Sequence, residues 1–425
     1  MWRAYPRHSV NLSWGCYKAV LGVFARGHVL QGPGVEQFEA EFARFIGVRH
    51  AIGVSSGRAA LYLAIKALGL AEGDEIIMPA YTFHIVPLVI NACGLKPVFV
   101  DVSPDTYNID VAALEKHITP RTKAISATHM YGQPCDLEPI LKIAQEHGLK
   151  VLEDCAHACG AMYKGRKVGS FGDLGLFTFA MAKNMPCFGG GMMTTNDSDL
   201  YNRLLSLVQF PQSSRHKSLW KEVISTTINY LCTRPKMFAL GIYPLMRALS
   251  AAGSPAFDRE PGQETVSPAE IQGKFPTRLT NLQAAVGLHQ LTRIEAINSK
   301  VSQNARLYNQ ELQAHNQIKT PQLSSERTHT FLYYRLEVAD RPNLRARLFR
   351  KGVDTAPDDM SDCTTLAPFC QYNVNVPVAR SLPEKILEIP NNLNLREDDI
   401  RYIARCIKEA AGPADSYRPD TPKSL

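Results

Sequence analysis

The sequence lacks the patterns that mark a secreted, metal-binding or membrane-spanning protein. Its ten cysteines are scattered, with no paired CxxC spacing and no dense framework for disulfides, as in proteins of a reducing cytosol. Residues 1–14 lack the apolar core of a signal peptide, and no run of about eighteen apolar residues could form a spanning helix. We therefore expect a cytoplasmic protein, soluble or peripheral to a membrane, without a metal site.

Acidic residues are scarce in one segment. Residues 201–250 contain seven Lys or Arg residues against one acid, Glu222, and so carry +6 of the chain's net charge of +7. This distribution argues against a nucleic-acid partner and predicts a local basic patch. Six aromatic residues share the segment: Tyr201, Phe210, Trp220, Tyr230, Phe238 and Tyr243. The composition suits helices lying on an anionic membrane surface; a helical lid or dimer arm with a buried apolar face is the alternative.

Short apolar runs alternate with helical patterns between residues 51 and 195. The runs are 51–54, 75–78, 97–101, 124–128, 150–153, 174–179 and 191–195, with amphipathic stretches such as 58–70 and 136–147 between them. This alternation predicts an α/β fold, with a mostly parallel, doubly wound sheet of seven strands and helices on both faces. Ligands of such sheets bind at the carboxyl ends of the strands.

The rest of the chain predicts a second unit. A long helical pattern at 279–312 is followed by a strand at 330–338 and helices near 342–351 and 397–411. We therefore expect a large domain over 1–310, with an atypical basic and apolar insertion at about 211–272. A polar, proline-rich loop is expected at 253–273, a smaller C-terminal α/β domain over 311–412 and a frayed tail at 413–425.

Two motifs suit the polar ends of one cofactor. Ser-Ser-Gly-Arg at 55–58 stands between a strand and a helix, where backbone N–H groups, the helix dipole and Arg58 form a phosphate cradle. Ser56 as an ordinary helix cap is the alternative. Asp154 ends a buried strand, where a carboxylate needs a partner such as a protonated pyridine nitrogen, and His157 is placed to lie against an aromatic ring. Asp154 as a cap of the following helix is equally compatible.

The third motif is Lys183, between the strand at 174–179 and the glycine-rich turn at 188–191. A lysine in a desolvated pocket has a lowered pKa and can form a Schiff base with an aldehyde, whereas many lysines at strand ends simply reach water. Phosphate, ring nitrogen and aldehyde are the groups that pyridoxal 5′-phosphate (PLP) presents. A nicotinamide dehydrogenase would instead need GxGxxG after the first strand.

Longer blocks of the chain resemble one protein family. They include GPGVEQFEAEFARFIGVRHAIGVSSGRAAL, VLEDCAHACGAMYKGRKVGSFGDLGLFTF and LTNLQAAVGLHQL. In order and spacing these blocks are similar to the DegT/StrS family of fold-type-I, PLP-dependent sugar-nucleotide aminotransferases, over roughly 30–200 and more loosely 276–412. The resemblance implies a homodimer with active sites at the subunit interface.

The resemblance assigns a role to seven residues. Lys183 matches the Schiff-base lysine, Asp154 the partner of the ring nitrogen, and His157 the residue that stacks on the cofactor. The others match an aromatic over or near the ring (Phe83), the phosphate turn (Gly57 and Arg58) and the phosphate-binding hydroxyl (Thr178).

Three positions depart from the family pattern. Arg58 stands where the phosphate turn usually has Thr, Gly189 stands in place of the acid of the usual GEGG turn, and Pro276 replaces an Asn that reaches the other subunit's phosphate. A charge-assisted hydrogen bond from Arg58 would offset the lost neutral donors.

The resemblance also implies a reaction. An amino acid, glutamate, would leave its amine on the cofactor for transfer to a keto-sugar, most often nucleotide-linked, with Lys183 carrying the proton between Cα and C4′. One alternative is a lipid-linked or membrane-resident keto acceptor, because of 201–250. Another is a PLP-dependent sugar dehydratase, which in this family has histidine in place of the lysine.

Overall fold

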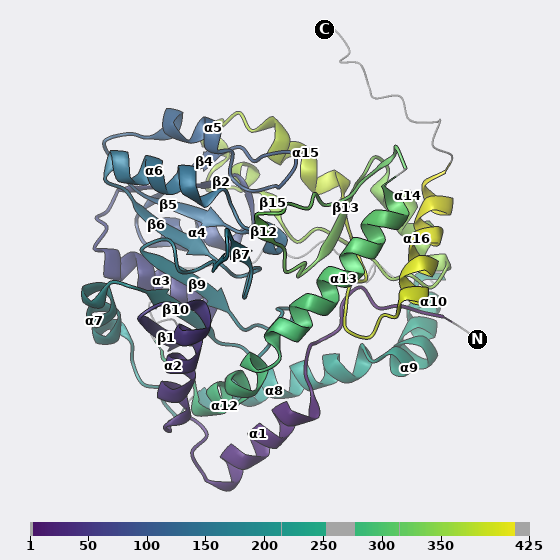
Figure 1. Cartoon of the computed structure of the whole chain (residues 1–425), viewed down its shortest axis with the longest axis horizontal. Helices are drawn as coiled ribbons and strands as arrows, with labels where there is room; N and C mark the ends of the chain where they lie inside the picture. Colours follow the sequence, from purple (N-terminus) through teal and green to yellow (C-terminus); the bar gives the residue numbers. More distant parts are fainter. Residues whose placement is uncertain (1–2, 214, 252–276, 314, 413–425) are drawn as a thin grey trace, which may run out of the picture.

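The computed structural model describes residues 3–213, 215–251, 277–313 and 315–412 (Figure 1). The loop predicted at 253–273, the tail at 413–425 and Pro276 lie outside these residues.

A seven-stranded sheet forms the centre of the larger part of the molecule. Its strands lie in the order β1 (His50–Val54), β10 (Gly191–Thr195), β9 (Leu174–Thr178), β6 (Lys150–Asp154), β5 (Thr122–Thr128), β2 (Glu75–Pro79) and β4 (Lys96–Val100). β10 runs antiparallel to both neighbours, and the other pairs in the sheet are parallel. The mostly parallel sheet predicted from the sequence is confirmed, and each strand begins and ends close to its expected bounds.

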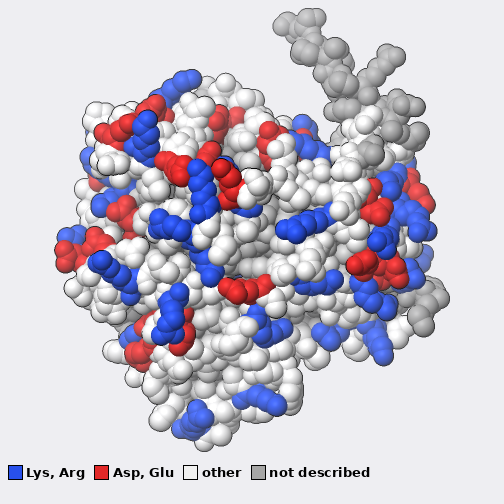
Figure 2. All heavy atoms as spheres, viewed as in Figure 1, with Lys and Arg blue, Asp and Glu red and all other residues white. Residues whose placement is uncertain are grey.

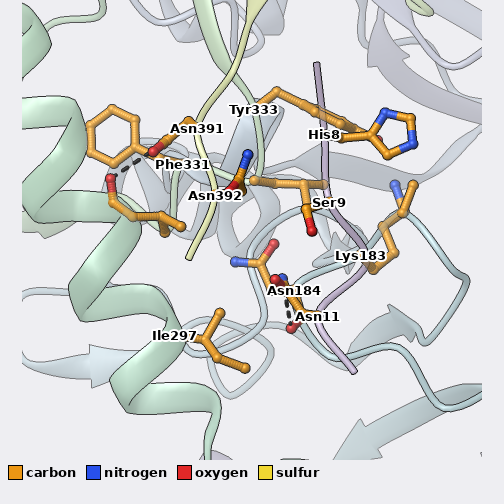
Figure 3. Close-up of a pocket in the computed structure, with 13 residues that line it drawn as sticks. His8, Ser9, Asn11, Lys183, Asn184, Ile297, Phe331, Tyr333, Asn391 and Asn392 are labelled. Atoms are coloured by element: carbon orange, nitrogen blue, oxygen red, sulfur yellow. Dashed lines mark hydrogen bonds between the residues drawn. The ribbon is translucent and has the colours of Figure 1, made fainter. Parts of the chain in front are cut away.

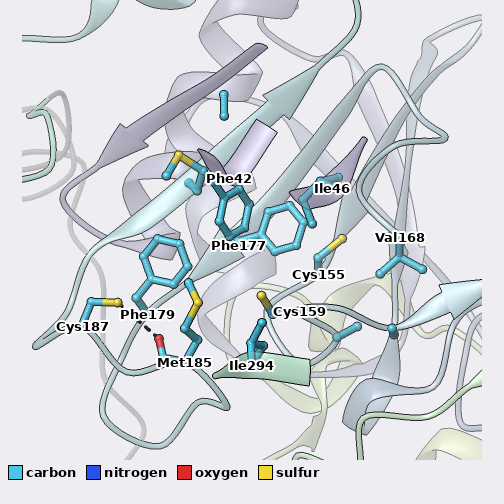
Figure 4. Close-up of a cluster of buried hydrophobic side chains, with 14 of the residues drawn as sticks. Phe42, Ile46, Cys155, Cys159, Val168, Phe177, Phe179, Met185, Cys187 and Ile294 are labelled. Atoms are coloured by element: carbon cyan, nitrogen blue, oxygen red, sulfur yellow. Dashed lines mark hydrogen bonds between the residues drawn. The ribbon is translucent and has the colours of Figure 1, made fainter. Parts of the chain in front are cut away.

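Helices cover both faces of this sheet because its strands are apolar on both sides. Within β2, Ile76 and Met78 pack into one buried cluster and Ile77 into the other, since alternate residues of a strand point to opposite faces. One face carries α2 (Gly34–Ile46), α6 (Leu137–His147) and α12 (Asn281–Leu291), and the other carries α3 (Gly57–Leu68), α4 (Ile85–Ala92) and α7 (Ser198–Leu207). Figure 4 shows part of the cluster on the face that carries α2, to which Ile77 belongs, where the rings of Phe42 and Phe177 meet edge to face.

The C-terminal part builds a second, antiparallel sheet. Its strands lie in the order β11 (Ile318–Lys319), β13 (Tyr334–Val338), β16 (Ile386–Ile389) and β14 (Ala356–Pro357), and α14 (Arg341–Arg350) and α16 (Glu397–Ala411) pack on it. β13 is shorter than the predicted strand at 330–338 because Phe331 has a φ of +44°, outside the extended region.

The helical pattern predicted at 279–312 is divided into α12 and α13 (Ile294–Leu312). Ile294 packs in the core of the large sheet, while Val301, Tyr308 and Leu312 pack in that of the small sheet. α13 therefore joins the two parts.

Residues 215–251, which hold most of the basic segment, fold into helices on the outside of the molecule. They are α8 (Arg215–Cys232), α9 (Pro235–Met237), the π-helix η3 (Phe238–Ile242) and α10 (Tyr243–Ala251). α1 (Trp14–Ala25) lies at the bottom of Figure 1, α8 runs to the right above it, and α9 and α10 lie at the right side. In the described part of the chain, no helix combines the length and apolar content that crossing a membrane requires.

Candidate active site

A cavity of about 460 Å³ opens at the carboxyl ends of the parallel strands. All seven site residues predicted from the sequence line it: Gly57, Arg58, Phe83, Asp154, His157, Thr178 and Lys183. They come from separate stretches of the chain and meet because β1, β6 and β9 point in the same direction and end at the same edge of the sheet.

One end of the cavity is built at the start of α3. Ser56 caps this helix, its Oγ accepting a hydrogen bond from Ala59 N at 3.1 Å. The first N–H groups of a helix have no acceptor within the helix, and with the positive end of the dipole they form an anion site. Glycine is required at 57, because a β-carbon there would lie 2.9 Å from Cβ of Thr178. Ser56 can therefore cap the helix while other N–H groups at the start of the same helix bind a phosphate.

Asp154 stands at the end of β6 and faces the cavity. Its Oδ1 accepts a hydrogen bond from Ala156 N at 3.0 Å. Burial raises the pKa of the Asp154 carboxyl, while this hydrogen bond, Lys183 and His129 act in the opposite direction. Among the described residues, no cation forms an ion pair with it within 4 Å. A buried carboxylate is stabilised by a positive partner, so a protonated ring nitrogen fits this position.

Lys183 lies in the turn between β9 and β10, and its side chain borders the same cavity. Burial lowers the pKa of the Lys183 amine, while Asp359 and Asp154 act in the opposite direction. A lowered pKa increases the neutral fraction of the amine, which is the form that attacks an aldehyde.

The glycine-rich stretch closes the turn that carries Lys183. Cys187 N and Gly189 N both donate to the carbonyl oxygen of Phe179, at 3.0 and 3.2 Å. Gly189 and Gly190 have φ angles of +90° and +97°, which glycine adopts at little cost. The glycines therefore let the chain double back and place Lys183 beside the ends of the strands.

The imidazole of His157 is held in one orientation. Its Nδ1 accepts a hydrogen bond from Tyr131 N at 3.2 Å, its ring lies parallel to that of Tyr131, and Tyr333 packs edge to face against it. Burial, together with Lys183, holds the pKa of His157 well below its usual range, so the ring is neutral. A fixed, neutral, flat ring in the cavity wall is suited to stacking on an aromatic cofactor.

Sequence reasoning missed two hydroxyl groups in the same cavity. Ser126 and Thr128 lie on β5, and their side-chain oxygens are buried without a hydrogen-bond partner in the described part of the chain. Buried hydroxyls are normally hydrogen-bonded. The position of 126–128 at the end of a predicted strand was a signal that could have found them.

The C-terminal part also contributes to the cavity, through Tyr333, Asp359 and Met360. Arg335 Nη2 donates to Asp359 Oδ1 at 2.8 Å. Burial raises the pKa of Asp359, but Arg335 and Lys183 outweigh it and bring the pKa to about 2, so the group is a carboxylate. No local sequence pattern singles out Asp359, because it reaches the cavity only through the packing of the two parts.

Lys183 also borders a second, smaller cavity, which the N-terminal segment lines with His8 and Asn11 (Figure 3). Asn11 Nδ2 donates to the carbonyl oxygen of Asn184 at 3.4 Å, and Asn184 Nδ2 donates to Asn298 Oδ1 at 2.8 Å. The N-terminal segment and α13 therefore help to hold the turn that carries the lysine.

Three buried residues could offer ligand atoms to a metal, with those atoms within 4.8 Å of one another: His129, Glu153 and Cys155. The Glu153 carboxylate already accepts hydrogen bonds from three backbone N–H groups at 2.7–2.8 Å, those of Gly169, Phe171 and Gly172. His129 Nε2 lies 3.3 Å from Glu153 Oε2. These contacts give the carboxylate a structural role in fixing the 169–172 loop.

The cavity fits PLP in the chemistry of its parts. The start of α3 offers N–H donors to a phosphate, Asp154 needs the positive partner that a protonated ring nitrogen supplies, and Lys183 can bind an aldehyde. When bound, PLP supplies an electron sink that stabilises a carbanion at Cα of an amino acid.

Comparison with known proteins gives the same answer. The model of the DegT/DnrJ/EryC1/StrS aminotransferase family matches residues 16–408. The chain belongs to this family. It is 32% identical over 402 residues to the spore coat polysaccharide biosynthesis protein SpsC of Bacillus subtilis (strain 168), covering 92% of each chain.

Two further proteins match this chain over most of its length. It is 31% identical over 381 residues to the GDP-perosamine synthase of Caulobacter vibrioides, covering 88% of this chain and 89% of that protein. The crystal structure of S. venezuelae DesV in complex with a ketimine intermediate matches with a TM-score of 0.76 and 26% identity, covering 98% and 100% of the two chains. The protein is thus an aminotransferase with PLP as its cofactor, and the resemblance seen in the sequence blocks is confirmed.

Proposed function

We propose that this aminotransferase moves an amino group from an amino acid, glutamate, to a keto-sugar linked to a nucleotide. One observation carries the proposal: a single cavity joins the phosphate turn, Asp154 and Lys183. The Caulobacter relative is a GDP-perosamine synthase, and its activity supports a nucleotide-linked acceptor. Lys183 also supports amino transfer over dehydration, since the family's dehydratases have histidine at this position.

We propose a separate task for each site residue. Lys183 would hold the cofactor through its aldehyde, and its amine would move the proton at Cα of the amino donor. Asp154 would favour the protonated form of the ring nitrogen, and His157 and Phe83 would help to hold the ring. The remaining three bind the phosphate: Gly57, Arg58 and Thr178.

Product analysis tests the reaction. The purified enzyme is incubated with PLP, glutamate and a panel of keto-sugar nucleotides, and the products are examined by mass spectrometry. We expect one acceptor to lose its carbonyl oxygen and gain an amine, with 2-oxoglutarate formed in equal amount. Loss of water from a sugar without amine incorporation would establish the dehydratase alternative instead.

We further propose that the protein forms a homodimer with the active sites at the subunit interface. We also propose that the chain divides into domains at 1–310 and 311–412. Sedimentation of the holoenzyme tests the first point, and a monomer with full turnover would contradict it. All ten cysteines are free thiols, which supports a cytoplasmic location.

A lipid-linked or membrane-resident ketone is the second candidate acceptor. Apolar side chains within 201–250 face solvent, among them Leu240 and Leu245. The same product analysis in detergent, with lipid-linked keto-sugars added to the panel, distinguishes the two acceptors.

A further inference from the structure

Exposed apolar side chains gather on helices that contribute no residue to the lining of the cavity. Thirteen large hydrophobic side chains are exposed in the described part of the chain, and Leu240 is 76% exposed and Trp14 66%. Ten of the thirteen lie on α1 and on α8 to α10: Trp14, Leu21, Phe24, Ile224, Ile228, Leu231, Met237, Leu240, Leu245 and Leu249. A group of this size marks an interaction surface more often than chance exposure.

On α1 and α8 the exposed residues follow stripes along the helix. The outer stripe of α8 contains Lys217, Lys221, Ile224, Ile228 and Leu231, spaced by three or four residues. The inner face of the same helix is buried through Leu219, Val223 and Thr226. α1 repeats the pattern, with Trp14, Lys18 and Leu21 outside and Cys16, Val20 and Val23 inside. The core packing of both helices is therefore complete without the outer stripes.

The two helices lie side by side. The ring centroids of Phe24 and Trp220 are 5.9 Å apart, and those of Tyr17 and Tyr230 are 6.0 Å apart. Because the later residue of α1 meets the earlier residue of α8, the helices run antiparallel. We call α1 and α8 to α10, which run from the bottom of Figure 1 to its right side, the outer helical face.

Cations accompany the apolar residues on this face. The exposed ones are Lys18, Arg26, Lys217, Lys221, Arg234, Lys236 and Arg247. The one acid within 14–26 and 215–251, Glu222, is bound by Arg215 through hydrogen bonds of 2.9 and 3.0 Å. Figure 2 shows white and blue at the end of the molecule that α1 forms.

We propose that the outer helical face docks on an anionic lipid bilayer. Apolar side chains would enter the headgroup boundary while the lysines meet lipid phosphates, as in amphipathic helices that lie in the plane of a membrane. The same face on a second copy would place cations against cations, whereas an anionic bilayer supplies the missing negative charge. Docking on a membrane is independent of the proposed reaction, and it is tested without measuring that reaction.

Vesicle co-sedimentation of the holoenzyme tests the proposal. Vesicles of phosphatidylcholine alone are compared with vesicles that also contain phosphatidylglycerol, at low and at high salt. We expect binding to the anionic vesicles at low salt and its loss at high salt. No binding to the anionic vesicles at low salt would overturn the proposal.

Paired variants locate the binding surface. Ile228→Asp with Leu240→Asp is expected to abolish binding, and Lys217→Glu with Lys221→Glu to lower partitioning at least tenfold. Leu323→Asp, also at an exposed leucine but outside the face, and Lys116→Glu with Lys142→Glu are the matched controls. Equal loss in the controls would overturn the assignment to this face.

The oligomeric state separates the two possible occupants. If Ile228→Asp with Leu240→Asp converts a dimer into a monomer while the unchanged enzyme ignores vesicles, the face is an interface between copies and the proposal is wrong. Retained PLP absorbance shows that each variant is folded. Failure of the proposed reaction would show in the product analysis and leave the vesicle result unaffected.

Discussion

Gly57 and Thr178 approach so closely that a β-carbon at position 57 would lie 2.9 Å from Cβ of Thr178. Gly57 begins α3 and Thr178 ends β9, so the contact joins the phosphate turn to the strand that leads to Lys183. A real β-carbon at 57 would force these elements apart.

The Gly57→Ala variant is therefore expected to bind PLP at least about tenfold more weakly, because the helix start and the hydroxyl of Thr178 no longer converge on one phosphate. Fluorescence titration with PLP measures the affinity. Gly22→Ala is the control, since nothing lies within 4 Å of a β-carbon there. An unchanged affinity in Gly57→Ala would show that the phosphate binds elsewhere.

Replacing Lys183 by alanine is expected to prevent covalent retention of the cofactor. Borohydride should fix PLP on the peptide containing Lys183 in the unchanged enzyme and on no peptide in the variant. Transamination should fall by about 10²–10⁴-fold, the usual contribution of a general acid–base. The idea fails if the label is recovered on another lysine.

The Asp154→Asn variant is expected to retain PLP but to lose about 10²–10³-fold in the half-reaction with glutamate. The amide cannot supply the negative charge that keeps the ring nitrogen protonated, and stabilisation of developing charge has effects of this size. Stopped-flow absorbance follows the half-reaction. A near-normal rate would assign the role to another acid.

Arg58→Ala is expected to weaken PLP affinity about tenfold or more while the rate of the chemical step at saturating cofactor stays close to normal. A hydrogen bond to a charged group is worth about 1.5–3 kcal/mol, and Arg58 replaces a neutral donor of the family. Lys66→Ala, later on the same helix, is the control. Unchanged affinity with intact folding would place Arg58 in the substrate site or make it a helix residue only.

Glu153→Gln is expected to lower the free energy of unfolding by about 1.5–3 kcal/mol at neutral pH, because the hydrogen bonds from the backbone N–H groups of the 169–172 loop lose their charged acceptor. Burial raises the pKa of Glu153, but the contact with His129 and the backbone N–H groups outweigh it and lower the pKa below its ordinary 4.5. The stabilisation is thus complete above the unfolded-state pKa and is lost as the pH falls through the folded-state pKa.

Urea unfolding measures this difference. The gap between Glu153→Gln and the unchanged protein should narrow as the pH is lowered through the acidic range, while Glu146→Gln, which is exposed, should change little at any pH. A constant gap would show that the carboxylate's charge is not what stabilises the 169–172 loop.

Much of the fold could be predicted because short stretches of the sequence encode its strands, helix starts and turns. The strand at 150–154 places Val151 and Leu152 before two acids, and the helix that begins at Gly57 is preceded by a Ser cap. Such patterns depend only on residues that are close together in the chain, so they can be recognised in the sequence. Five of the predicted site residues are of this local kind: Gly57, Arg58, Asp154, His157 and Lys183. Phe83 and Thr178 were predicted only from the resemblance to the family.

Contacts between distant stretches could not be predicted in this way. Asp359 and Tyr333 reach the cavity only because α13 carries the C-terminal sheet against the large one, and no residue near them in the chain signals this. The break of the predicted strand at Phe331, where φ is positive, also involves distant residues, because Thr330 N and Leu332 N on either side donate to the carbonyl oxygens of Gly132 and Tyr131.

The sequence by itself determined the α/β class and the seven-stranded sheet, because periodicity, caps and turn glycines act over a few residues. The PLP cofactor followed from three local motifs taken together with the resemblance to the family. Only the tertiary structure decided which side chains of the basic segment face outward. Composition is the same for a buried arm and for an exposed one; it is the packing of Leu219 and Val223 inward that leaves Ile224 and Ile228 on the surface. Burial is a property of the whole fold, which no local pattern contains.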